Sequence, residues 1–331
     1  MSSITKTASC DFVLSVSPCF AILIFVFTSP CVIANDWSTQ IKLESSFLNY
    51  HDSDVRDSAY TIGGQVHLDF LEKMYFLTGY RYSHVDALAN NLVNMEEIQE
   101  DLFFIGAQYN FYSDILPGKY GLRVDAYYGE METFFTIFQE AEFQGRNRKP
   151  ASSVTMIQDN DFASISPVLS YTNYLKTLYF DFVFAFSDYG DFSVNQFSPA
   201  FGFAFNARKN WMLFRGHFIE QEKNFTTVYG KNNTAIEVSW THWLGLNAPL
   251  GLNSFGASIL AGERIYALDP DANQVFTFAD LQKGSVAFFF QWQPNELVQI
   301  LIQAGSQKFE DKVIGDNYSS KYAYVNLSRK W

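Results

Sequence analysis

The sequence predicts an all-β protein, an up-and-down antiparallel transmembrane β-barrel of about fourteen strands, with twelve as the alternative count. Three observations favour this fold. Apolar and polar residues alternate along much of the chain, aromatic residues make up 18% of it, and no segment after Phe27 has the ~18 consecutive apolar residues of a spanning helix. A closed barrel is the one membrane architecture left for such a chain.

The first 34 residues differ from the rest and predict a cleaved signal peptide. A polar start containing Lys6 precedes the apolar run "CFAILIFVF", which ends at Phe27 and is followed by "TSPCVIAN". The run is too short to span a bilayer, and the small residues after it suit cleavage after Ala34. All three cysteines lie in this segment, so residues 35–331, predicted to form a single barrel domain, have no thiol for a disulfide, a catalytic thiolate or a zinc site.

The alternation of apolar and polar residues predicts the individual strands. In "LYFDFVFAFS" the residues Leu178, Phe180 and Phe182 share one face and Asp181 lies on the other, because successive side chains of a strand point to opposite faces. The same pattern recurs in "YTIGGQVHLDF", "GLRVDAYY", "AIEVSWT" and "VAFFFQW". The predicted strands are 37–50, 57–70, 75–86, 98–112, 120–130, 161–173, 177–188, 195–206, 211–220, 232–245, 254–266, 280–293, 297–308 and 319–331.

The connections between these strands alternate between short and long. Turns such as "EKM", "NYLKT" and "QPNE" are short, whereas the segments between them are longer and more polar. An even strand count with this alternation is typical of a bacterial outer-membrane barrel and places both termini at the short-turn, periplasmic end. All six tryptophans fall at that end, where they are predicted to anchor the barrel at the membrane interface: Trp37, Trp211, Trp240, Trp243, Trp292 and Trp331.

The inward face is predicted to carry the ionisable residues, because a charge at the membrane midplane costs ~2–4 kcal/mol on the outside of a barrel. In an open lumen these residues would line a channel and select solutes by charge and size; in a plugged lumen they would pair into a structural network. The candidates are Lys42, Glu44, His67, Asp69, Arg81, Arg123, Asp125, Asp181, Arg215, His217, Glu237 and Arg264.

Two connections raise specific hypotheses. Segment 131–160 is too long for a plain hairpin loop, so it either folds inward and narrows the pore, contacts lipopolysaccharide phosphates through Arg146, Arg148 and Lys149, or is a solvated surface loop. The tract "LDPDANQ" lacks the glycine and distal glutamate of a calcium-binding loop and is interpreted as an acidic extracellular loop.

Several functions are disfavoured by the sequence. A formal net charge of −12 argues against a nucleic-acid partner. No metal-ligand spacing or nucleotide motif occurs, so no metal and no cofactor is predicted. His67 and Asp69 share a strand face and are the best candidate catalytic pair, but no motif places a serine beside this histidine or beside His217. We therefore expect no enzyme, with a lipid-active barrel hydrolase as the alternative.

The "VIA" cleavage site and the aromatic-terminated last strand "YAYVNLSRKW" resemble Gram-negative outer-membrane β-barrel proteins. The resemblance implies an outer-membrane location, contact with membrane lipid and lipopolysaccharide, and recognition of the last strand by the barrel-assembly machinery. Arg329 departs from the pattern, which usually has an apolar residue there. The expected function is a porin-like channel for passive passage of small solutes. The alternative is a non-channel surface barrel that resembles an autotransporter without its passenger.

Overall fold

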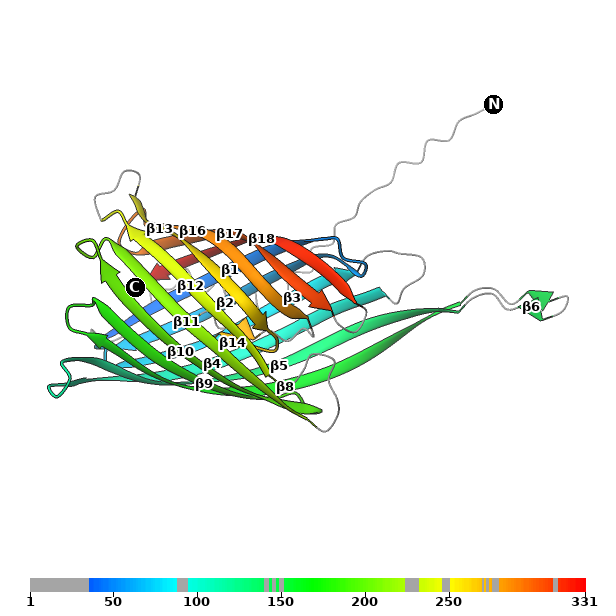
Figure 1. The fold of residues 1–331 in the computed structure, drawn as a ribbon, viewed down its shortest axis with the longest axis horizontal. Coiled ribbons are helices and arrows are strands. Elements are labelled where there is room, and N and C mark those ends of the chain that lie inside the picture. The colour runs from blue at the N-terminus through cyan, green and yellow to red at the C-terminus, as the bar shows by residue number, and fades with distance from the viewer. Residues whose placement is uncertain are drawn as a thin grey trace, which may run out of the picture. The chain divides into compact units, whose positions relative to one another are not determined.

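Fourteen strands close into one antiparallel barrel in the computed structural model (Figure 1). The predicted fold class and the count of fourteen are thus confirmed. The structure describes residues 36–87, 95–139, 143–144, 147–148, 152–223, 232–245, 251–269, 271, 274–275, 280–311 and 315–331. The predicted signal peptide, residues 1–34, lies outside the described residues. No helix among the described residues is long and apolar enough to cross a membrane.

Each strand of the barrel wall pairs with its neighbours in chain order. The wall strands are β1 (Trp37–His51), β2 (Arg56–Phe70), β3 (Met74–Ala87), β4 (Met95–Ser113), β5 (Gly118–Gln139), β8 (Ser152–Asn173), β9 (Leu178–Asp188), β10 (Phe192–Phe205), β11 (Asn210–Lys223), β12 (Asn232–Trp243), β13 (Leu252–Arg264), β16 (Leu281–Trp292), β17 (Val298–Asp311) and β18 (Asp316–Lys330). Two short pairs lie in connections: β6 (Phe143–Gln144) with β7 (Asn147–Arg148), and β14 (Leu268–Asp269) with β15 (Gln274–Val275).

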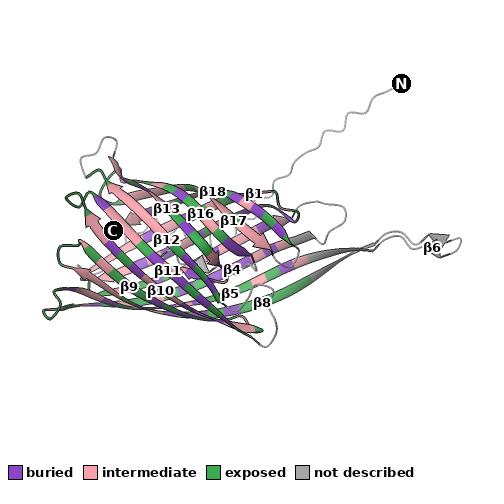
Figure 2. Ribbon diagram, viewed as in Figure 1, coloured by how far each residue is buried: buried purple, intermediate pink, exposed green. Residues whose placement is uncertain are grey.

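The wall strands have one apolar exposed face and one polar buried face. On β9, Phe180 and Phe184 are exposed, whereas Asp181 and Val183 between them are buried. Buried and exposed bands therefore alternate along the ribbons (Figure 2). An apolar outside and a polar inside is the reverse of a soluble core and is what a barrel in lipid requires, because its outer side chains face hydrocarbon.

The barrel closes where the last strand meets the first. β18 pairs with β1 from Gln40↔Lys330 to His51↔Ser319, and the Trp331 backbone N–H donates to the carbonyl of Thr39 at 2.8 Å. Arg329 is a charged residue at a position of the last strand that is usually apolar, and it has a local partner. Its guanidinium carbon lies 5.0 Å from the centre of the Trp331 ring, within cation–π range. The charge thus stays at the strand end beside an aromatic partner.

The six tryptophans lie at or near the strand ends that short turns connect. Their role as interface anchors remains a prediction.

At the opposite end of the barrel, segment 131–160 differs from the predicted loop. Residues 131–139 continue β5 and residues 152–160 continue β8, and the two strands stay paired to Gln139↔Ser152. Inward folding is therefore wrong for the described strand residues, because their backbone pairing extends the barrel wall as a long hairpin (Figure 1). Arg146 and Lys149 lie outside the described residues, and Arg148 is described only as part of β7.

Candidate functional site: the lumen and its inward loop

The twelve ionisable residues predicted for the inward face all lie on the strand face opposite the exposed apolar side chains. Eight of them are buried: Glu44, His67, Arg81, Asp125, Asp181, Arg215, His217 and Arg264. The other four, Lys42, Asp69, Arg123 and Glu237, are partly exposed. Charged groups are thus collected inside the barrel, as the cost of placing them in lipid requires.

Six of these residues form three close ion pairs. Buried charges are stable only when paired, so removing one partner leaves the other at a cost of about 3–5 kcal/mol. The pairs are Arg81 with Glu44 at 2.7 Å, Arg123 with Asp125 at 2.9 Å, and Arg215 with Asp181 at 2.7 Å.

The candidate catalytic pair does not form. A Tyr75 hydroxyl hydrogen-bonds Nδ1 of His67, and Nε2 of the same ring lies 3.1 Å from the Gln65 side-chain oxygen. Asp69 instead accepts the backbone N–H of Glu72 at 2.8 Å and so stabilises the turn after β2. Each side chain has a structural partner of its own, which leaves no His–Asp contact to activate a nucleophile.

Part of the connection between β13 and β16 lies inside the barrel, and we call its described residues, 265–269, 271, 274–275 and 280, the inward loop. Asp271 of this loop bridges two guanidinium groups of the wall, those of Arg215 on β11 at 2.7 Å and Arg123 on β5 at 3.3 Å. Asp269 lies 3.8 Å from Arg215. The interpretation of this acidic tract as an extracellular loop is therefore wrong. The physical reason is that the two inward guanidinium groups provide the carboxylates with charge-assisted hydrogen bonds inside the lumen.

The inward loop is also held by apolar and backbone contacts. Leu268 is almost fully buried against a cluster that includes Leu77, Phe104 and Tyr127 of the wall. Its backbone N–H donates to the side-chain oxygen of Gln196 at 2.9 Å, and its carbonyl accepts from the side-chain nitrogen of the same residue at 2.8 Å. This two-point contact matches the N–H and the C=O of one residue to a side-chain amide and satisfies the buried polar atoms of both.

The far end of the inward loop is fixed separately. Asp280, just before β16, forms an ion pair with Arg56 of β2, and the Arg56 guanidinium also donates to the Tyr318 hydroxyl at 2.6 Å. Arg56 and Asp280 are both buried. The loop is thus anchored at its tip by Asp271 and at its base by Asp280, on different parts of the wall.

A buried polar chain continues from the loop contact into the wall. The Gln196 side-chain nitrogen donates to Ser198 at 2.8 Å, Ser198 lies 3.2 Å from Nδ1 of His217, and Nε2 of His217 lies 3.7 Å from Glu237. The order Ser–His–Glu resembles a hydrolytic triad, but Ser198 and His217 are about 1% exposed. No substrate reaches a hydroxyl enclosed in this way, so the chain acts as a polar support for the docked loop.

Beside the inward loop the lumen keeps a chamber of about 550 Å³. Its wall carries six carboxylate side chains: Glu44, Glu100, Glu237, Asp269, Asp271 and Asp280. It also carries four guanidinium groups: Arg56, Arg81, Arg215 and Arg264. Asp269 and Asp271, at the tip of the docked loop, belong to the first set. Without these two carboxylates the chamber would have four charges of each sign, so the docked tip makes it acidic.

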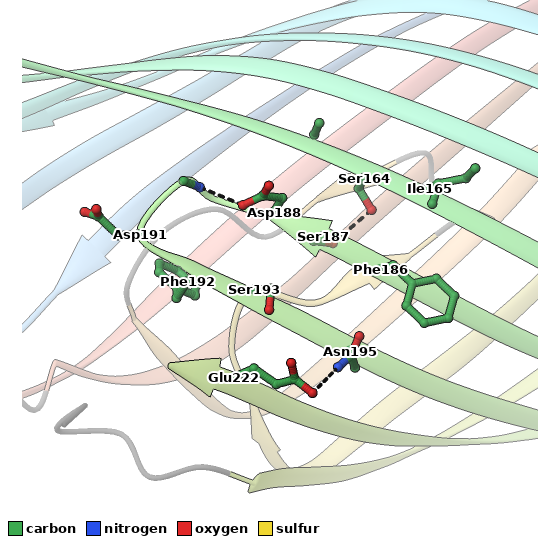
Figure 3. A pocket seen from close by; sticks show the side chains of 12 residues that line it. Ser164, Ile165, Phe186, Ser187, Asp188, Asp191, Phe192, Ser193, Asn195 and Glu222 are labelled. Atoms are coloured by element: carbon green, nitrogen blue, oxygen red, sulfur yellow. Dashed lines mark hydrogen bonds between the residues drawn. The ribbon is translucent and has the colours of Figure 1, made fainter. Parts of the chain in front are cut away.

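A second hollow, of about 770 Å³, lies on the outer face near the loop ends of β8, β9 and β10 (Figure 3). It is lined by outward residues such as Ile165 and Phe186 and by three carboxylates, of which Glu222 accepts a hydrogen bond from Asn195 at 3.1 Å. None of the predicted site residues lines it. The luminal chamber is lined by five of the twelve predicted residues, Glu44, Arg81, Arg215, Glu237 and Arg264, and is therefore the candidate functional site.

The electrostatics of Asp271 predict how the loop responds to pH. Enclosure within the barrel by itself raises the pKa of this carboxyl, but Arg215 and Arg123 outweigh it and hold the pKa below its ordinary value of 3.8. A carboxyl with a lowered pKa stabilises the docked state above its ordinary pKa, and that stabilisation is lost as the pH falls through the lowered value.

We therefore expect the conductance of the purified protein in a planar bilayer to stay constant from pH 7 to about pH 4 and to rise only below about pH 3.8. The Asp271→Asn variant serves as the control, because it has no carboxyl at this position and lacks the acid-dependent step. A rise centred near pH 6 in the wild-type protein would assign the response to a different group.

Sequence reasoning missed Asp269, Asp271, Gln196 and Leu268 as site residues. For the three loop residues a signal was present in "IYALDPDANQ", whose first four residues are apolar or aromatic although exposed loops are usually polar, whereas Gln196 of β10 had no such signal. Among the described residues no cluster of three or more His, Cys, Asp or Glu side chains has the arrangement of a metal site.

Comparisons with known proteins place the fold. The sequence matches no family model and no curated protein. Similar solved structures are a FadL homologue of Pseudomonas aeruginosa (9% identity, 90% of each chain covered, TM-score 0.53) and the P. putida toluene transporter TodX (9% identity, 90% of this chain and 91% of that one, TM-score 0.53). The monoaromatic hydrocarbon channel CymD has 6% identity, coverage of 89% and 88%, and a TM-score of 0.52. The chain thus has the fold of Gram-negative outer-membrane β-barrel proteins.

Proposed function

We propose that this protein is an outer-membrane channel for passive passage of small solutes, closed or narrowed by its inward loop. The observation that carries the proposal is a chamber of about 550 Å³ beside a loop that is docked through ion pairs inside the barrel. A barrel of fourteen strands is wider than the eight-stranded barrels that side chains fill, so its interior has room for both a loop and a water-filled space.

The channel proposal agrees with two of the similar structures, a toluene transporter and a monoaromatic hydrocarbon channel. It includes export by the predicted signal peptide, an outer-membrane location and assembly through the last strand. The pairing of that strand with β1, which completes the barrel, supports the last of these. It assigns no catalysis, since His67 and His217, the histidines of the inward face, contact structural partners.

The proposal is tested by conductance in a planar bilayer. We expect small or rare openings for the wild-type protein and a several-fold larger conductance when residues 267–279 are replaced by a short flexible linker. The physical reason is that this change removes Leu268, Asp269 and Asp271 while keeping the Arg56–Asp280 anchor.

Folding of the shortened variant is checked by heat-modifiable migration on a gel, which reports a closed barrel. If the folded variant and the wild-type protein both fail to conduct ions, the channel proposal is wrong. The protein would then fit the alternative of a surface barrel that acts through its extracellular segments.

A further inference from the structure

The inward loop presents two different groups to one region of the wall. Asp271 contacts Arg123 and Arg215, and Leu268, three residues earlier, is buried in an apolar cluster that includes Tyr127. Tyr127 and Arg123 belong to the same inward row of β5, because residues two apart in a strand share a face. Asp125, the ion-pair partner of Arg123, lies between them in this row, so the apolar cluster and the guanidinium pair are neighbouring parts of one surface.

The loop occupies this surface in the manner of a small ligand. It inserts one branched apolar side chain and one carboxylate, and the carboxylate bridges two guanidinium groups that come from strands on different parts of the wall. Planar guanidinium groups are the side chains best suited to recognise a carboxylate. Asp271 also remains accessible from the chamber, with 47% of its side chain exposed.

While the loop is docked, Arg123 and Arg215 face more carboxylates than the two that pair with them in the wall. Arg123 and Arg215 already have permanent wall partners in Asp125 and Asp181, which hold the two guanidinium groups in place. The loop adds Asp271 and, 3.8 Å from Arg215, a second carboxylate. A solute with a single carboxylate would satisfy both guanidinium groups and bring one negative charge fewer, so it can replace the loop at a lower electrostatic cost.

We infer that Arg123, Arg215 and the apolar cluster around Leu268 form a binding site for small monocarboxylates with a compact apolar body, and that the inward loop is the built-in competitor for this site. Binding of the solute excludes Asp271 and Leu268 from the wall and so opens the channel. The acidic chamber also loses two carboxylates when the loop leaves, which favours the entry of an anion. The inference rests on the proposed channel function and names its substrate class.

The test is a calorimetric titration of the detergent-solubilised full-length barrel with 4-methylpentanoate, which carries a branched apolar end and one carboxylate. When the loop competes with the solute, the apparent Kd equals the intrinsic Kd divided by the fraction of molecules whose site is free of the loop. We therefore expect Asp271→Asn to bind the carboxylate about tenfold more tightly than the wild-type protein, and Arg123→Gln to lose measurable binding. The uncharged 4-methylpentan-1-ol should not bind, and acetate should bind more weakly than 4-methylpentanoate.

Lys283→Gln is the matched control. Lys283 forms an ion pair with Glu263 at 3.0 Å, and neither residue takes part in the loop contacts. Each variant is first checked for heat-modifiable migration, and Asp271→Asn keeps the inference testable if Arg123→Gln does not fold.

In planar bilayers, 4-methylpentanoate should raise the fraction of time that the wild-type channel is open, and 4-methylpentan-1-ol should not. Equal or weaker binding by Asp271→Asn would overturn the inference. If the loop-shortened variant conducts while no carboxylate binds any variant, the channel stands and the substrate class is wrong.

Discussion

The double variant Asp269→Asn, Asp271→Asn is expected to hold the channel open far more often than the wild-type protein. Both substitutions keep the size of the side chain and remove its charge, so Arg123 and Arg215 lose their loop partners but keep Asp125 and Asp181. A hydrogen bond to a charged group contributes ~1.5–3 kcal/mol, and the half-exposed position of Asp271 lowers this figure.

A total of about 2 kcal/mol shifts the closed-to-open equilibrium roughly thirtyfold, so a channel open about 1% of the time becomes open about a quarter of the time. Single-channel recording at neutral pH measures this fraction directly. Lys283→Gln, which breaks an ion pair outside the loop, should record like the wild-type protein. If the double variant gates like the wild type while the loop-shortened variant stays open, Leu268 and Gln196 hold the loop and the ion pairs do not.

Removal of β18 is expected to abolish the barrel completely. Residues 316–331 supply the strand that pairs with both β1 and β17, and without it two strand edges face lipid. An unsatisfied backbone N–H or C=O in hydrocarbon costs several kcal/mol, and each edge carries many such groups. A chain ending at Gly315 should therefore show no heat-modifiable form after refolding in detergent.

Trp331→Ala is the matched control for this truncation. It removes the ring beneath Arg329 but keeps the two backbone hydrogen bonds between residue 331 and Thr39, at 2.8 and 3.3 Å. The substituted protein should fold in detergent nearly as well as the wild type, since no ladder bond is lost. A heat-modifiable form of the truncated chain would show that β17 closes onto β1 directly and that the fourteenth strand is dispensable.

The wall of this barrel could be predicted because its signal is local. Residues such as Phe180, Asp181 and Phe182 alternate between lipid and lumen within a few positions, so the face of each side chain follows from its parity. Polar turns then set where each strand ends. The same local rule explains the error at segment 131–160, because "METFFTIFQ" alternates less cleanly between apolar and polar residues. The sequence therefore predicts a connection there, although the segment continues β5.

Pairing inside the lumen was only partly predictable. Parity identifies Arg123 and Asp125 as neighbours on one face, but it does not show which residues of other strands approach them. His67 illustrates the limit: it shares a face with Asp69, yet its partners are Gln65 and Tyr75. The choice of partner depends on strand register and side-chain direction, which a one-dimensional pattern does not contain.

By itself the sequence determined the two faces of the strands and the closure through "KYAYVNLSRKW", and it limited the strand number to fourteen or twelve, because these depend on side-chain periodicity along a continuous segment. Only the tertiary structure decided where the loop after β13 goes. Asp271 meets Arg123, which is 148 residues away, and Arg215, which is 56 residues away, and these distant groups converge only when the barrel closes. The acidic residues of this loop lie inside the barrel because the guanidinium groups that pair with them are there.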